Sequence, residues 1–382
     1  MKFLKKTTQY QIQKHLRFVI GMASLGLYPL AGQALGANPD PKTAKEDPDG
    51  KTLWYDCKNM KIEGKGWSDT EACYDRLPLK SKSVAPKMVW DLSKDSTGMC
   101  IRFTTDAKSI NVRWSPTLKN GDVPYALPHM AATAVSGVDL YAKSKNEKWQ
   151  FKGNGRPTAS VSKAYFNTTP GQEHLLYLPL YNGVSLLEIG IPKDRTISQP
   201  DAAALKKAIV FYGTSVTQGA CASRPGMSST AITGRKLDAP VINLGFSGSG
   251  KMEIEMAALL SELDPSIYVI DCLGNMTPEM LTERVEPFVK TLRTKHQDTP
   301  IVLVEDASLY NVTPTVKGKI LRSIYEKLVA QGMGNLYFLP NNNMLGDDGE
   351  ATVDGAHLND LGMMRLAEVF ASFLAPILLK QK

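Results

Sequence analysis

Residues 208–219 read AIVFYGTSVTQG, an unbroken apolar run that ends in a small, polar turn. Four later apolar runs have the same form, with helix-like segments between them: PVINLG at 240–245, SIYVIDCL at 266–273, PIVLVED at 300–306 and NLYFLP at 335–340. Continuous apolar strands that alternate with helices are typical of a parallel sheet covered on both faces. The sequence from 205 to 382 therefore predicts a doubly wound α/β domain with a five-stranded parallel sheet, whose ligand site lies at the carboxyl ends of the strands.

The preceding stretch, from about 50 to 195, has a period of two instead. Ile110, Val112 and Trp114 alternate with polar residues, and turn-forming stretches such as KGNGRP separate the runs. Short alternating strands with frequent turns predict an antiparallel β-sandwich. A turn-rich linker near 195–206 is expected to join it to the α/β domain.

All five tryptophans lie in this first half, and two interpretations of them are open. Tryptophan can stack on sugar rings, so the sandwich could be a carbohydrate-binding accessory domain. Alternatively, these side chains pack in the core or between the domains. The tryptophans are Trp54, Trp67, Trp90, Trp114 and Trp149.

The first 37 residues predict a secretory signal peptide. Residues 1–17 carry five basic residues and no acid, an apolar run follows at 18–31, and small residues lead to Ala37. These are the three parts of such a signal. An uncleaved anchor is the alternative, although the apolar run is short for a membrane span. We expect cleavage, a periplasmic or secreted mature protein, and no later segment long and apolar enough to cross a membrane.

The net charge gives no reason to expect nucleic acid as a partner. The whole chain has 45 basic and 38 acidic residues, a net charge of +7. Without the five basic residues of 1–37 the count is 40 against 38, or +2. The basic character therefore belongs largely to the export signal.

The five cysteines are an odd number, which leaves at least one thiol unpaired. Cys57 and Cys73 flank one short polar loop, and either a bridge between them or two free thiols is possible in an oxidising compartment. The sequence has no CxxC pair and no cluster of cysteine with histidine. It therefore predicts no zinc site.

Small or polar residues follow the apolar runs, where a parallel sheet would gather them. Ser215 follows the first run, Gly248 the second and Asn275 the third, and near the C-terminus Asp354 stands three residues before His357. Each residue alone has an ordinary structural interpretation; a serine after a strand, for example, often only caps a helix. The strand ends at which they stand are where such folds bind their ligands.

Together these stretches resemble the SGNH/GDSL hydrolase family, which is named for a Ser, a Gly, an Asn and a His in four sequence blocks. The resemblance implies that Ser215 is the nucleophile and that Asp354 and His357 form the D-x-x-H block. It also implies an oxyanion hole made by the backbone N–H groups of Ser215 and Gly248 and the side-chain amide of Asn275.

The resemblance extends to the first half, where the GVDLY stretch at 137–141 looks like the motif that precedes this domain in some bacterial members. It implies a jelly-roll-like sandwich followed by a flavodoxin-like hydrolase domain. Two positions depart from the family pattern. Thr214 stands where GDSL proteins have Asp, and the third block reads LGNM rather than G-x-N-D.

The chemistry of these residue types agrees with the resemblance. Serine is a poor nucleophile until a base takes its proton, and His357 is the best candidate for that base near neutral pH. Asp354 can orient the imidazole and stabilise the imidazolium. His296 lies in the charged run TKHQD at a helix end and is expected to face solvent or the helix dipole. Such a site needs no metal and no organic cofactor.

The stretch GFSGSGKM at 245–252 offers a competing interpretation, because it contains the G-x-x-x-x-G-K pattern of a phosphate-binding loop. Asp271 would then be the acid that supports the metal. The pattern requires Ser or Thr after the lysine, however, and Met252 stands there. Export would also remove the protein from cytosolic ATP. We therefore assign the stretch to the turn of the second SGNH block.

The sequence predicts an exported two-domain serine esterase that hydrolyses acyl esters, O-acetyl esters of carbohydrates above all. Its partner is a small-molecule or polysaccharide ester, not nucleic acid. The alternatives are a catalytically silent carbohydrate-binding protein, or a lipase or thioesterase of the same family.

Overall fold

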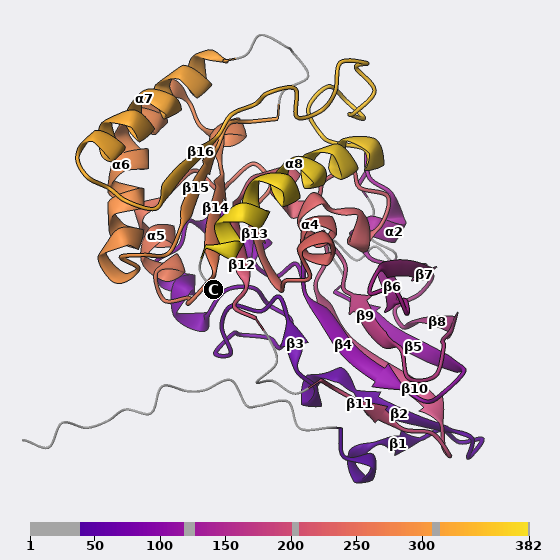
Figure 1. Cartoon of the computed structure of the whole chain (residues 1–382). Helices are drawn as coiled ribbons and strands as arrows, with labels where there is room; N and C mark the ends of the chain where they lie inside the picture. Colours follow the sequence, from indigo (N-terminus) through magenta and orange to yellow (C-terminus); the bar gives the residue numbers. More distant parts are fainter. Residues whose placement is uncertain (1–38, 118–126, 201–205, 308–313, 381–382) are drawn as a thin grey trace, which may run out of the picture. The chain divides into compact units, whose positions relative to one another are not determined.

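The computed structural model describes residues 39–117, 127–200, 206–307 and 314–380 (Figure 1). These residues all belong to one compact unit of the chain. The predicted signal peptide at 1–37 and the middle of the predicted linker, 201–205, lie outside the described residues.

Two antiparallel sheets form the first half of the described chain. The first has the strand order β1 (Lys45–Glu46), β2 (Thr52–Asp56), β10 (Val184–Pro192), β5 (Ser109–Pro116) and β8 (Ser162–Asn167). The second has the order β11 (Ile197–Ser198), β4 (Cys100–Thr105), β9 (Glu173–Tyr177), β6 (Val138–Lys143) and β7 (Trp149–Gly155), and β3 (Ile62–Glu63) also pairs with β4. The short helix η1 (Pro41–Thr43) precedes the first strand, and four more lie between strands: η2 (Cys57–Asn59), η3 (Leu79–Ser83), α1 (Lys87–Leu92) and α2 (Ala132–Val135). The predicted antiparallel sandwich is confirmed.

The period of two is clear on β5 but not on β10. Along β5 every second residue, from Ile110 to Pro116, is buried, and the residues between them are half-buried. On β10, Glu188 and Gly190 are buried as well. The Glu188 carboxylate is paired with Arg113 of β5, and Trp54 packs against Gly190. The face of β10 that the alternation predicts to be exposed is therefore buried, because Glu188 is neutralised by an ion pair and glycine at position 190 leaves room for Trp54.

Four of the five tryptophans are buried, and only Trp149 is half-buried. Trp114 is fully buried and its indole N–H donates to the Ser136 carbonyl oxygen at 2.9 Å. Packing in the core or between the two halves of the chain is therefore the correct interpretation for these four. Cys57 and Cys73 are free thiols, as are the other three cysteines, so no bridge forms between them.

The second half contains a five-stranded parallel sheet, as the sequence predicts. Its strand order is β13 (Val241–Gly245), β12 (Ile209–Gly213), β14 (Ile267–Asp271), β15 (Ile301–Val304) and β16 (Leu336–Leu339). In order along the chain this is 2-1-3-4-5, the flavodoxin-like order. The sheet reverses direction of winding at its first strand, and ligands bind such folds at the carboxyl ends of the strands near that point.

Helices cover both faces of this sheet (Figure 1). They are α3 (Ser215–Gln218), η5 (Pro225–Met227), α4 (Ser229–Leu237), α5 (Ile254–Leu260), η6 (Leu273–Asn275), α6 (Pro278–Lys295), α7 (Val316–Ala330) and α8 (Asp360–Leu379). Along β12, Val210 and Tyr212 point into one apolar cluster with residues of α5, α6 and α7. Ile209 and Phe211 point into the other, with residues of α4 and α8. Both faces are buried, which explains the unbroken apolar runs of the sequence.

Helix α8 corrects one expectation. Its 20 residues are long and apolar enough to cross a membrane by length and composition, whereas the sequence was expected to contain no such segment after residue 37. One face of α8, including Phe370 and Leu374, is buried in the apolar cluster beside the sheet. The helix as a whole is this apolar because its other face also carries exposed apolar residues, such as Met364 and Leu379. We describe α8 as a core helix of the α/β fold.

The chain segment between β3 and β4 packs against the parallel sheet. Arg76, fully buried, donates to the carbonyl oxygens of Gly245 at 2.6 Å and of Leu92 at 2.7 Å. Trp67 and Trp90 belong to the same apolar cluster as α5. The carboxyl end of β13, where the second sequence block begins, is therefore held from the first half of the chain.

Candidate active site

The end of β12 positions Ser215. A Cβ at Gly213 would lie 2.1 Å from the Thr217 hydroxyl and 2.5 Å from the Asp271 carbonyl oxygen, so only glycine fits there. Thr214 then caps α3 by accepting a hydrogen bond from the Val216 N–H at 3.2 Å. Ser215 begins the helix and does not serve as its cap, which leaves its hydroxyl free for another partner.

That partner is His357, which the loop before α8 carries to the same edge of the sheet. The Ser215 Oγ lies 3.1 Å from His357 Nε2. On the other side of the ring, Nδ1 lies 2.7 Å from the Asp354 carboxylate. Because an ionised carboxylate can only accept, Nδ1 carries the ring proton and Nε2 is left to accept from the serine hydroxyl. This is the arrangement of a Ser–His–Asp triad.

Asp354 is itself fixed by its own loop. Its second carboxylate oxygen accepts the backbone N–H groups of His357 at 2.8 Å and of Ala356 at 3.0 Å. The hydrogen bonds from the His357 ring and backbone hold the pKa of Asp354 well below its usual range. Asp354 is therefore ionised at neutral pH, as its predicted role requires.

A pocket of about 330 Å³ opens beside these residues. Its lining is mostly polar or small: Thr214, Ser215, Val216, Asp271, Gly274, Asn275, Asp306, Ala307, Gly355, Ala356 and His357. Two of the lining side chains, Asp271 and Asp306, are acids at the carboxyl ends of neighbouring strands of the sheet. We predicted Asp271 only as a metal-supporting acid of the competing phosphate-loop interpretation, and nothing in the sequence pattern drew attention to Asp306.

Asp271 has an unusual environment for a carboxyl group. It is buried at the end of β14 and accepts a hydrogen bond from the Thr217 hydroxyl at 2.8 Å. Burial, reinforced by the nearby Asp306 charge, raises the pKa of Asp271 to about 7, although the Thr217 hydrogen bond opposes the shift. Asp271 is thus partly protonated at neutral pH.

The predicted oxyanion donors do not all share this pocket. Ser215 and Asn275 both line it, and one amide N–H of Asn275 donates to the Ser249 carbonyl oxygen. A side-chain amide has a second N–H to offer. Gly248 is exposed in the turn after β13, has a φ of +65° and is not among the lining residues. Its role as an oxyanion donor stays a prediction.

His296, the other histidine of the α/β half, lies elsewhere. It ends α6, where a ring nitrogen lies 2.9 Å from the Ser261 carbonyl oxygen and the ring packs edge-on to Tyr268. It does not line the pocket.

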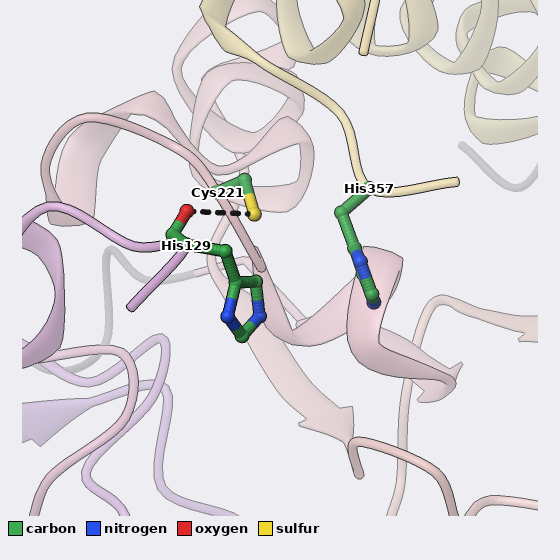
Figure 2. A group of neighbouring side chains, drawn as sticks. All are labelled: His129, Cys221 and His357. Atoms are coloured by element: carbon green, nitrogen blue, oxygen red, sulfur yellow. Dashed lines mark hydrogen bonds between the residues drawn. The ribbon is translucent and has the colours of Figure 1, made fainter. Parts of the chain in front are cut away.

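Two further residues lie beside His357 that sequence reasoning missed. The ring of His129 has its centroid 5.6 Å from that of His357, and the Cys221 thiol donates to the His129 carbonyl oxygen at 3.3 Å. Figure 2 shows the three side chains, which come from three separate segments of the chain. The sequence has no local cluster of cysteine with histidine, but the fold brings one cysteine and two histidines together from distant positions.

Two family models match the chain. The GDSL-like lipase/acylhydrolase family matches residues 206–375. The model named GxDLY, the N-terminus of SGNH-hydrolase-type esterases, matches residues 52–197, a range that contains the GVDLY stretch. No curated protein sequence matches the chain.

Solved structures share this two-part fold. A GDSL-like lipase from Bacteroides ovatus is 34% identical, with a TM-score of 0.78 over 86% of this chain and 98% of its own. A salicylyl-acyltransferase from a tetracycline biosynthetic pathway is 17% identical, with a TM-score of 0.65 over 91% and 96%. A family two carbohydrate esterase from Clostridium thermocellum, in complex with cellohexaose, is 14% identical, with a TM-score of 0.51 over 73% and 92%. At such low identity the last two are similar in fold alone.

The similarity to the Bacteroides ovatus protein extends over nearly all of that protein, and the two family models cover the two halves of this chain in order. We conclude that the chain belongs to the GDSL-like (SGNH) lipase/acylhydrolase family, with a GxDLY domain in front of the hydrolase domain, and that it is an esterase or acylhydrolase.

Proposed function

We infer that the protein is an exported serine esterase that removes short acyl groups, acetyl above all, from carbohydrate esters. The observation that carries this proposal is the pair of hydrogen-bond distances around the His357 ring: 3.1 Å to the Ser215 hydroxyl and 2.7 Å to the Asp354 carboxylate. Export rests on the predicted signal peptide at 1–37, which lies outside the described residues.

The reaction proceeds in two steps. His357 Nε2 takes the hydroxyl proton as the Ser215 oxygen attacks the ester carbonyl, and Asp354 stabilises the imidazolium that forms. The imidazolium then gives its proton to the departing sugar oxygen. In the second step His357 takes a proton from water as the water oxygen attacks the acyl-serine, and it then returns that proton to the Ser215 oxygen as the carboxylic acid leaves.

The negative charge that develops on the ester oxygen needs hydrogen-bond donors. The Asn275 amide and the backbone N–H of Ser215 supply them in this proposal, with Gly248 as the third family donor. Because Asn275 already donates one N–H to the Ser249 carbonyl, its amide is oriented before substrate binds.

The character of the pocket supports a small acyl group on a polar alcohol. Hydroxyl, amide, imidazole and carboxyl groups supply much of the lining, and Val216 is its largest aliphatic side chain. A long acyl chain would gain about 0.8 kcal/mol per buried CH₂ only in an apolar groove. The carbohydrate esterase from Clostridium thermocellum, which shares the fold, was solved with cellohexaose, and this motivates the choice of carbohydrate esters.

The test is acetate release from a panel of acetylated glycans, with 4-nitrophenyl acetate, butyrate and octanoate as chain-length probes. We expect turnover of at least one acetylated glycan and a preference for acetate over octanoate, with Ser215→Ala as the inactive control. A preference for octanoate would support the lipase alternative. No turnover of any ester, together with measurable glycan binding, would support the catalytically silent carbohydrate-binding protein.

A further inference from the structure

Three side chains of the kinds that bind zinc meet at the proposed catalytic base. They are His129, Cys221 and His357, and their ligand atoms, one ring nitrogen from each histidine and the thiol sulfur, all lie within 4.8 Å of one another. In Figure 2 they surround one common space. The family resemblance and the proposed esterase reaction assign no role to His129 or Cys221.

The three residues differ in their freedom to move. His129 is exposed, Cys221 is buried to all but 8% of its surface, and His357 is half-buried. In tetrahedral zinc sites, bond lengths of about 2.0–2.3 Å place ligand atoms about 3.5 Å apart. The ligand atoms must therefore come closer together by roughly 1 Å than their present separation of up to 4.8 Å. A rotation of the exposed His129 ring can bring them closer, because no hydrogen bond to that ring occurs among the described residues.

The donor set indicates the class of ion. Two imidazole nitrogens and one thiolate suit a borderline-soft divalent cation and not Mg²⁺ or Ca²⁺, which take oxygen ligands. Three protein ligands leave the fourth tetrahedral position to water. The Cys221 thiol loses its proton to the buffer when the metal binds, as thiol ligands do.

We propose that His129, Cys221 and His357 form an inhibitory binding site for Zn²⁺. His357 has two ring nitrogens, and each makes one of the hydrogen bonds of the triad: Nδ1 to Asp354 and Nε2 to Ser215. A zinc ion on either nitrogen therefore removes the histidine as a base. If Nε2 is the ligand, Asp354 still holds Nδ1, which is the carboxylate–histidine–metal arrangement common in zinc proteins.

The inhibition experiment measures hydrolysis of 4-nitrophenyl acetate by the full-length mature protein against increasing Zn²⁺, with a phosphine reductant present. We expect inhibition that excess chelator reverses. His129→Ala and Cys221→Ser, each compared with its own zinc-free rate, should raise the Zn²⁺ concentration for half-inhibition by at least about tenfold, since even outer-shell partners of a metal site contribute about 10–100-fold. This part rests on the proposed function.

Matched controls remove an imidazole or a thiol elsewhere. His296→Gln and Cys73→Ser leave the three ligands intact, so their half-inhibition concentration should equal that of the parent protein. A half-inhibition concentration that is unchanged in both His129→Ala and Cys221→Ser overturns the proposal. An equal rise in the control variants also overturns it, because zinc would then act at scattered surface groups.

A second measurement does not depend on esterase activity. Co²⁺ is titrated into the reduced parent protein, and we expect one equivalent to produce a thiolate-to-cobalt charge-transfer absorption that is absent in Cys221→Ser and present in Cys73→Ser. Loss of this band in Cys221→Ser supports the site even if no ester is turned over. Absence of the band in the parent protein overturns the site and leaves the proposed function intact. Metal binding without inhibition of an active enzyme overturns the inhibitory role.

Discussion

Asp360 binds Ser223 through two hydrogen bonds, accepting the backbone N–H at 2.8 Å and the hydroxyl at 2.6 Å. Ser223 lies in the loop that follows the Ser215 helix, and Asp360 begins α8 just after the His357 loop. The pair therefore connects the segment that carries the nucleophile with the segment that carries the base. It is a positioning contact, because neither side chain lines the pocket.

We expect Asp360→Ala to lower kcat for an acetyl ester on the order of tenfold with little change in KM. A misplacement of about 1 Å between reacting groups can cost about 10²-fold. Asp360→Asn keeps an acceptor oxygen and should recover most of the rate. Glu350→Ala removes an exposed acid of the same region and serves as the control. A parallel loss in kcat and thermal stability that Asn does not recover would indicate a purely structural role.

Ser215→Ala should lower kcat by at least about 10³-fold while the fold is retained. The hydroxyl is the only group lost, and within the described part of the chain no other side chain makes a hydrogen bond to His357 Nε2. Steady-state kinetics with 4-nitrophenyl acetate and a circular dichroism spectrum check the two statements. Near-normal activity in a preparation free of contaminating esterase would remove Ser215 as the nucleophile.

His357→Ala and Asp354→Asn should differ in severity. His357→Ala is expected to be nearly as damaging as Ser215→Ala, because the two residues act as one proton-transfer unit. The loss of kcat in Asp354→Asn should be about 10²-fold smaller than the loss in His357→Ala, because the carboxylate only orients and stabilises the ring.

The measurement for this pair is kcat/KM for both variants across the neutral range. Wild-type behaviour of Asp354→Asn would leave a Ser–His dyad, with the ring held by other groups. Wild-type behaviour of His357→Ala would place the base elsewhere, and His296 would be the next residue to test.

The buried carboxyl of Asp271 predicts a stability that depends on pH. Its pKa is raised to about 7 in the folded protein, against about 3.9 in an unfolded chain. Between these values the unfolded chain has lost the proton that the folded chain keeps, so stability from this group falls as pH rises from about 4 to about 7. Asp271→Asn removes the titration and retains an acceptor for Thr217.

The thermal midpoint of Asp271→Asn, relative to wild type, should therefore rise between about pH 5 and pH 8. Differential scanning calorimetry at several pH values measures it, and Glu350→Gln, an exposed acid, is the control. A difference that is constant over this range would contradict the prediction.

Activity should survive exhaustive chelation, because proton transfer among Ser215, His357 and Asp354 requires no metal. Protein isolated with zinc on the inhibitory site should even gain activity. Loss of activity on chelation, with recovery on adding one divalent ion, would contradict the prediction. The first ligands to test would then be the acids Asp347, Asp348, Glu350 and Asp354, although Asp348 already binds Arg365 through both carboxylate oxygens at 2.7 Å.

The sequence by itself determined the two kinds of sheet and their order along the chain. The unbroken run at 209–213 became a strand buried on both faces, and the alternation around Val112 became a strand with one buried face. Periodicity predicts such elements because burial on one face or two is a local consequence of side-chain direction. The motif also identified Ser215, Asp354 and His357, which the fold then brings together.

Only the tertiary structure decided which side chains surround that site. Cys221 meets the His129 carbonyl across 92 positions, and Glu188 is buried through its ion pair with Arg113 across 75. Such contacts depend on strand order and helix packing, and the local periodicity of the sequence carries no information about either. For the same reason the acids Asp271 and Asp306 came together unpredicted. They lie at the carboxyl ends of neighbouring strands of a sheet whose order the sequence pattern does not state, and the burial of Asp271 and the repulsion from Asp306 exist only once that sheet is formed.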